Sequence, residues 1–69
     1  MDYKEAIELI DGLLDDLDEI PESGEDFAES VRDKITSMRE WIEDKERVTE
    51  KMETALMNMQ GGINKWLHR

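Results

Sequence analysis

An apolar residue recurs at every third or fourth position from Ala28 to Trp66, with one interruption. This spacing is typical of a helix that buries one stripe against a neighbouring helix. Both halves of the seam keep one heptad register, although Lys45 and Thr49 occupy the seam positions between them. The seam therefore predicts an all-α fold. Its apolar members are Ala28, Val31, Ile35, Met38, Ile42, Met52, Leu56, Met59, Ile63 and Trp66.

A second apolar stripe predicts a helix over residues 3–20. Its members are Tyr3, Ala6, Ile7, Ile10, Leu13, Leu14, Leu17 and Ile20. Asp2 is a suitable N-cap, because its carboxylate can accept a hydrogen bond from a free N–H group in the first turn. Pro21 disfavours helical geometry in the preceding residue, so we expect this helix to end at Ile20. The short turn that follows, with Ser23 as the next N-cap, predicts an antiparallel helical hairpin.

The sequence leaves open whether one long helix or two helices follow that turn. Residues 43–49 interrupt the seam but contain neither Gly nor Pro. Arg39, Glu43 and Arg47 also have the i, i+4 spacing of ion pairs on a continuous helix. One prediction is therefore a long, coiled-coil-like second helix. The other is a break near residue 46, which gives three helices of similar length and a three-helix bundle.

The last part of the chain determines the predicted assembly. We expect the helix to continue through Gly61 and Gly62, because the apolar register is kept beyond them. In the long-helix alternative, the second half of the seam extends past the first helix, and a homodimer would cover it. In the three-helix alternative, the third helix covers its own stripe and a monomer suffices. The residues predicted for self-association are Met52, Leu56, Met59, Ile63 and Trp66.

The length of 69 residues predicts a single small helical domain over 1–69. A core of this size seldom supplies more than ~3–5 kcal/mol of net stability. The absence of cysteine excludes disulfides and thiolate metal sites. No apolar run approaches the ~20 residues that span a bilayer. We therefore expect a soluble, cytoplasmic protein that does not enter a membrane.

Negative charge is concentrated in the first part of the chain. The net charge is −10, with −11 in residues 1–30 and +1 in residues 31–69. Carboxylates on the first predicted helix step by three and four, opposite its apolar stripe. Like charges at this spacing destabilise a helix, and anions near its C-terminus oppose the helix dipole. Such conflicts often indicate a functional surface. The predicted partner-binding face comprises Glu8, Asp11, Asp15, Asp16, Asp18, Glu19 and Glu22.

This acidic face predicts a non-enzymatic module that binds a basic protein. DNA presents a phosphate every ~3.4 Å along each strand, and a rigid row of carboxylates can imitate that field. One form of the prediction is therefore an inhibitor of a nucleic-acid-binding protein. Direct binding to nucleic acid is not expected, because like charges repel. As an alternative interpretation of the acidic face, its carboxylates only interact with solvent and bind no partner. As an alternative function, the protein is a self-associating coiled-coil assembly protein.

No catalytic, cofactor or metal motif stands out in the sequence. Residues 11–22 carry acids at three positions of a calcium-binding loop, but Leu13 and Leu17 stand where ligands are needed and Asp16 where glycine is. His68 is the only histidine, and it has no acid or nucleophile beside it in the sequence. We expect it to act as a cation near a helix C-terminus. No enzymatic activity, cofactor or metal is predicted.

Overall fold

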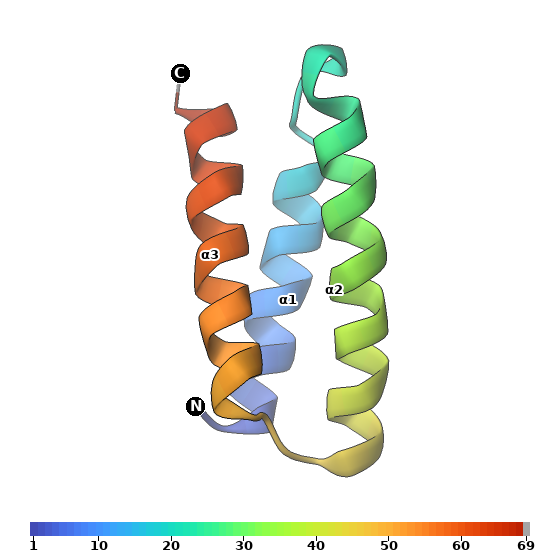
Figure 1. The fold of residues 1–69 in the computed structure, drawn as a ribbon, viewed down its shortest axis with the longest axis vertical. Coiled ribbons are helices and arrows are strands. Elements are labelled where there is room, and N and C mark those ends of the chain that lie inside the picture. The colour runs from blue at the N-terminus through green and yellow to red at the C-terminus, as the bar shows by residue number, and fades with distance from the viewer. Residues whose placement is uncertain (69) are drawn as a thin grey trace.

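The computed structural model describes residues 1–68, which form three α-helices and one turn of 3₁₀ helix. Helix α1 spans Tyr3–Leu17, η1 spans Glu22–Gly24, α2 spans Glu25–Lys45 and α3 spans Glu50–Leu67. Each α-helix runs antiparallel to the next, in a molecule of 35 × 17 × 17 Å (Figure 1). The all-α prediction is confirmed, and the chain adopts the three-helix alternative.

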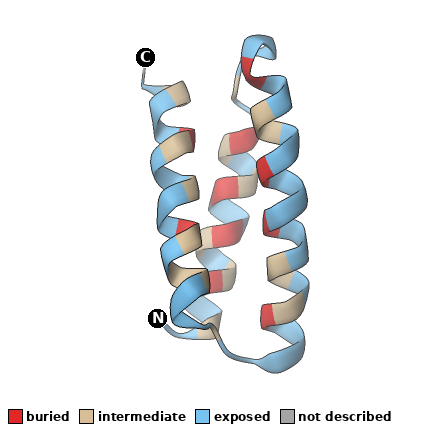
Figure 2. Ribbon diagram, in the orientation of Figure 1, coloured by how far each residue is buried: buried red, intermediate tan, exposed pale blue. Residues whose placement is uncertain are grey.

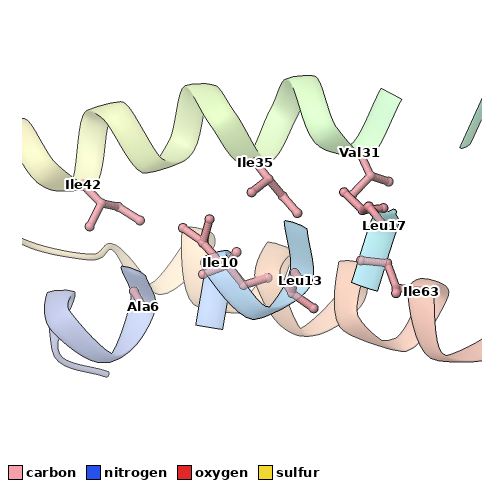
Figure 3. Close-up of a cluster of buried hydrophobic side chains, with 9 residues drawn as sticks. Ala6, Ile10, Leu13, Leu17, Val31, Ile35, Ile42 and Ile63 are labelled. Carbon is pink, nitrogen blue, oxygen red and sulfur yellow. The ribbon is translucent and has the colours of Figure 1, made fainter. Parts of the chain in front are cut away.

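The core is a column of aliphatic side chains between the three helices. The inward faces of all three helices carry the buried residues (Figure 2), and Figure 3 shows Ile10 of α1 pointing toward Ile35 of α2. All ten apolar seam residues are buried or half-buried, so the seam faces the core as predicted. The buried side chains are Ala6, Ile10, Leu13, Leu17, Val31, Ile35, Ile42, Leu56 and Ile63.

The predicted long second helix is wrong, because α2 ends at Lys45. Glu46 has φ 54° and ψ 38°, the left-handed region, and its N–H donates to the Ile42 carbonyl oxygen at 2.8 Å. This conformation costs a non-glycine residue ~1–2 kcal/mol. Burial of Leu56 and of Ile63 contributes ~1.5–3 kcal/mol each. The gain exceeds the cost, so the chain turns back and packs α3 against its own core.

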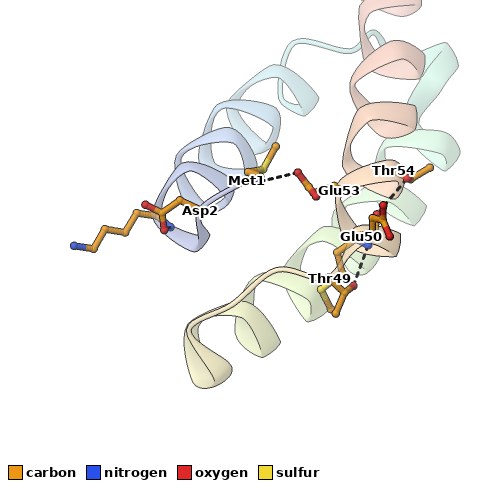
Figure 4. Close-up of polar contacts among 8 residues, drawn as sticks. Met1, Asp2, Thr49, Glu50, Glu53 and Thr54 are labelled. Carbon is orange, nitrogen blue, oxygen red and sulfur yellow. Dashed lines mark hydrogen bonds and ion pairs between the residues drawn. The ribbon is translucent and has the colours of Figure 1, made fainter.

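The residues that interrupt the seam build the connection between α2 and α3. Thr49 Oγ1 accepts a hydrogen bond from the Met52 N–H at 3.1 Å, so Thr49 is the N-cap of α3 (Figure 4). The guanidinium of Arg47 lies 5.6 Å from the centre of the Trp41 ring, a cation–π contact. Arg47 therefore does not extend the row of ion pairs with Glu43 that favoured a continuous helix.

Glu46→Gly is expected to stabilise the protein by ~1 kcal/mol, because glycine adopts the left-handed conformation without a steric cost. Urea denaturation measures the change in the free energy of unfolding. The matched variant Glu40→Gly lies inside α2, where glycine is expected to cost ~1 kcal/mol. Destabilisation of similar size by both substitutions would contradict the break at residue 46.

Helix α1 ends at Leu17, three residues before the predicted boundary. The Asp18 N–H donates to the Asp15 carbonyl oxygen at 3.2 Å, so the helix closes in a tight 3₁₀-type turn. The carboxylates near this end oppose the helix dipole, and Ile20 precedes Pro21, which excludes helical geometry there. Both effects shorten the helix.

The start of α2 differs from the prediction that Ser23 caps it. The 3₁₀ turn η1 comes first, and Gly24 is the N-cap without a side-chain hydrogen bond. Gly24 is buried, and a Cβ atom there would lie 2.7 Å from Ile20 Cγ2 and 3.1 Å from the Trp66 ring. The close approach of these two side chains therefore requires glycine.

Helix α3 continues through Gly61 and Gly62, as predicted. A Cβ atom on Gly62 would lie 3.1 Å from Phe27 Cζ, whereas one on Gly61 would meet nothing within 4 Å. The Phe27 and Trp66 rings stack with centroids 6.4 Å apart and planes at 23°. Gly62 thus makes room for one ring of this pair.

The N-terminal residues attach α1 to α3. Asp2 Oδ1 accepts a hydrogen bond from the Lys4 N–H at 3.2 Å, which confirms Asp2 as the N-cap. The Met1 ammonium lies 2.9 Å from Glu53 Oε1 on α3 (Figure 4). This ion pair joins the start of the chain to the third helix.

The Met1–Glu53 ion pair predicts a loss of stability above pH 8. The hydrogen bond to Glu53, together with its negative charge, raises the pKa of the Met1 ammonium above its ordinary value of 8.0. A raised native pKa means that the stabilisation is complete below pH 8 and is lost as the pH rises through that native pKa. The melting temperature should therefore fall more steeply above pH 8 in the parent protein than in Glu53→Gln. Parallel slopes would contradict this.

Candidate functional site

The predicted acidic face lies on α1 and on its connection to α2. Six of its seven members are exposed, and Asp16 is half-buried. The same helical periodicity that turns Ile10, Leu13 and Leu17 inward turns Glu8 and Asp15 away from the core. The structure therefore places most of these carboxylates in solvent, and their local partners divide them into two groups.

The first group forms ion pairs with α2. Arg39 Nε lies 3.0 Å from Asp11 Oδ1, and Arg32 Nη2 lies 2.6 Å from Asp18 Oδ1. The acids are seven residues apart, one on α1 and one at its C-cap, and the arginines are seven apart on α2. The antiparallel arrangement therefore brings both pairs into register. Arg39 also contacts Glu43 at 2.7 Å. Asp11 and Asp18 therefore fasten α1 to α2 as well as contributing to the acidic face.

The hydrogen bond to Asp11 raises the pKa of Arg39, so this guanidinium remains charged throughout the physiological range. Exposed ion pairs of this kind contribute less than about 1 kcal/mol each. Neutralising Asp11 and Asp18 would thus remove two weak links between helices. A test of partner binding is cleaner when it leaves both residues in place.

The second group has no ion-pair partner among residues 1–68. It comprises Glu8, Asp15, Asp16, Glu19 and Glu22. The last turn of α1 contains no basic residue that would offset the carboxylates of Asp15 and Asp16. The carboxylates of Asp15 and Asp16 therefore destabilise α1. No ion pair within the described part of the chain compensates for their charge.

Residues 15–29 extend the acidic face across the α1–α2 end of the bundle. They include eight acidic residues and no basic one. Glu25 and Asp26 have a structural explanation, because they lie in the first turn of α2, where the helix dipole favours anions. Glu29 lies beyond that turn, so the dipole explains it less well. We refer to residues 15–29 as the acidic cap.

A groove of about 690 Å³ opens in the acidic cap, between the end of α1 and the first half of α2. Sequence reasoning missed it, because it depends on how residues 17–21 cross α2. Apolar side chains and four carboxylates line it together with one arginine. The lining residues are Leu17, Asp18, Ile20, Pro21, Glu22, Glu25, Ala28, Glu29 and Arg32.

The residues predicted for self-association face the core of the same chain. Leu56 and Ile63 are completely buried. Met52, Met59 and Trp66 are half-buried, and the two methionines pack against the same cluster. The homodimer was predicted only for a long second helix, whose apolar stripe would be left uncovered. In the structure the chain folds back, and α1 and α2 cover this stripe.

The remaining candidates for chemistry are isolated. His68 is exposed at the C-cap of α3, and its N–H donates to the Asn64 carbonyl oxygen at 2.9 Å. Within residues 1–68, no group of three or more His, Asp or Glu side chains is placed to hold a metal ion. The acidic face and its groove are thus the surface with the most distinctive chemistry in the described part of the chain.

No family model, curated protein or solved structure matches the chain. Over residues 1–68, none of the helices has the length and apolar character needed to cross a membrane.

Proposed function

We propose that this protein is a non-enzymatic binding module whose acidic face meets a basic protein. The observation that carries the proposal is the group of carboxylates without an ion-pair partner in residues 1–68, above all Asp15 and Glu19. Exposed carboxylates keep most of their hydration, so a cationic partner can pair with them at a small desolvation cost. The summed field of a chain with net charge −10 also accelerates encounter with a basic surface.

The proposed partner is a protein whose basic surface otherwise binds nucleic acid, and the module inhibits it by occupying that surface. Glu8, Asp11 and Asp15 form a row on α1, and Asp18 at its C-cap continues the row. The row spans ~15 Å at 1.5 Å per residue, and one DNA strand presents about five phosphates over that length. Asp11 and Asp18 pair with arginines of α2, so Glu8 and Asp15 carry the uncompensated negative charge of this row. The proposed setting is the cytoplasm, because a chain without cysteine loses nothing in a reducing compartment.

Neutralising Asp15 and Glu19 is expected to weaken partner binding at least tenfold, a loss of ~1.4 kcal/mol, while the helical fold persists. Both side chains are exposed and lack ion pairs in residues 1–68. The measurement uses Asp15→Asn/Glu19→Gln as bait for host proteins at low ionic strength. Captured proteins are then tested for displacement of a labelled DNA or RNA duplex.

The matched control is Asp33→Asn/Glu40→Gln, which removes the same two charges from exposed positions of α2. It is expected to retain binding, apart from a small effect of net charge. Binding through the acidic face should also weaken with salt, because the screening length falls from ~10 Å at 0.1 M to ~3 Å at 1 M. Equal losses in both variants, or capture that resists salt, would count against the proposal.

A further inference from the structure

The groove in the acidic cap differs from the rest of the acidic face because apolar side chains line it beside the carboxylates. Leu17 is buried, whereas Ile20 and Ala28 are half-buried and line the groove. Pro21 is exposed and is the fourth apolar residue of the lining. An imitation of a phosphate backbone needs charge alone. A lining that combines apolar side chains with carboxylates suits a ligand that brings an apolar side chain as well as positive charge.

The rim of the groove is acidic on both sides. Asp18 and Glu22 belong to the segment that follows α1, and Glu25 and Glu29 belong to α2. Of these four carboxylates, only Asp18 has an ion-pair partner within residues 1–68, and that partner is Arg32. The rim therefore has a net negative charge and selects a cationic ligand.

We propose that this groove binds a basic peptide segment in which one apolar side chain lies between arginine or lysine residues. The apolar side chain packs against Ile20, Pro21 and Ala28 in the lining of the groove. The flanking cations pair with the carboxylates of Glu22, Glu25 and Glu29. This inference rests on the proposed function, since it names the part of a basic partner that the acidic face would hold.

Arg32 already shows how the groove receives a guanidinium. Its Nη2 lies 2.6 Å from Asp18 Oδ1, and both residues line the groove. Arg32 therefore occupies a carboxylate that a ligand arginine could otherwise use. Its removal should make Asp18 available and tighten binding.

The first experiment uses two labelled peptides in fluorescence anisotropy titrations with the full-length protein. One peptide has arginines on both sides of a single leucine, and the other has serine in place of that leucine. We expect the leucine peptide to bind about tenfold more tightly, because partial burial of a leucine contributes roughly this factor. Equal affinities would overturn the apolar part of the proposal.

The second experiment separates the groove from the general negative field. Glu29→Gln is expected to weaken binding of the leucine peptide several-fold, whereas Glu40→Gln, which removes the same charge outside the groove, leaves it nearly unchanged. Arg32→Gln is expected to tighten binding several-fold more than Lys34→Gln, the matched loss of an exposed cation. Circular dichroism confirms that each variant is folded. Equal effects within each pair would overturn the groove as the binding site.

The outcomes also separate this inference from the proposed function. Displacement of nucleic acid could depend on Asp15 and Glu19 while the variants of each matched pair bind the leucine peptide with equal affinity. In that case the acidic face binds partners and the groove does not. If the leucine peptide binds with the predicted dependence on Glu29 while no nucleic acid is displaced, the groove inference holds and the proposed inhibition fails.

Discussion

Leu56→Asp is expected to unfold the protein rather than to dissociate an oligomer. Leu56 has no exposed surface and lies in the core cluster with residues of α1 and α2. Truncation of a buried leucine to alanine already costs 2–5 kcal/mol, roughly the whole net stability of a core this small. A buried, unpaired carboxylate adds a further cost. Far-UV circular dichroism should show that most of the helical signal is lost.

Met57→Asp is the matched control, because the neighbouring side chain is 65% exposed on the same helix. This variant is expected to keep the helical content and to melt within a few degrees of the parent protein. Sedimentation equilibrium of the parent protein should give a monomer of 8.1 kDa. A dimer that Leu56→Asp converts into a folded monomer would instead support self-association through this stripe.

The periodicity of the sequence was sufficient to predict an all-α fold and the inward faces of its helices. Ile35 and Ile63 occupy seam positions and are completely buried. Asp2 was also predictable as an N-cap, because it directly precedes an amphipathic stripe and its carboxylate can accept a hydrogen bond from the first turn. These features depend on residues close together in the chain, so the linear pattern contains them.

The break between α2 and α3 was not decided by the sequence. Glu46 adopts a conformation that glutamate rarely takes, and burial of the α3 stripe compensates for it. Thr49 was the available signal, since threonine is a good N-cap, but its place in the heptad register favoured a seam position instead. A gain that comes from contacts distant in the chain cannot be read from the local pattern.

The candidate site was predictable in its charge and not in its shape. Spacing alone identified the carboxylates of α1 as one row, yet it could not show that Asp11 and Asp18 meet arginines of α2. Those contacts depend on the register between two helices. The groove depends in turn on the path of residues 17–21, which follows from the early end of α1.

The second large loss of stability is expected from a substitution at the α1–α2 end of the bundle, where Gly24 allows the Trp66 ring to pack closely. Gly24→Ala places a Cβ atom 2.7 Å from Ile20 Cγ2 and 3.1 Å from the Trp66 ring. Stacking on Phe27 limits how far Trp66 can move away, since Phe27 itself lies against α3 at Gly62.

Overpacking of this kind costs ~1–3 kcal/mol, so Gly24→Ala should lower the free energy of unfolding by that amount in urea titrations. Trp66 fluorescence should also shift, because its ring is displaced. Gly61→Ala is the control, since its Cβ atom would meet nothing within 4 Å. There the better helix propensity of alanine should raise stability by ~1 kcal/mol. A gain of stability in both variants would show that Trp66 is free to move, and that close packing at Gly24 does not hold this end of the bundle together.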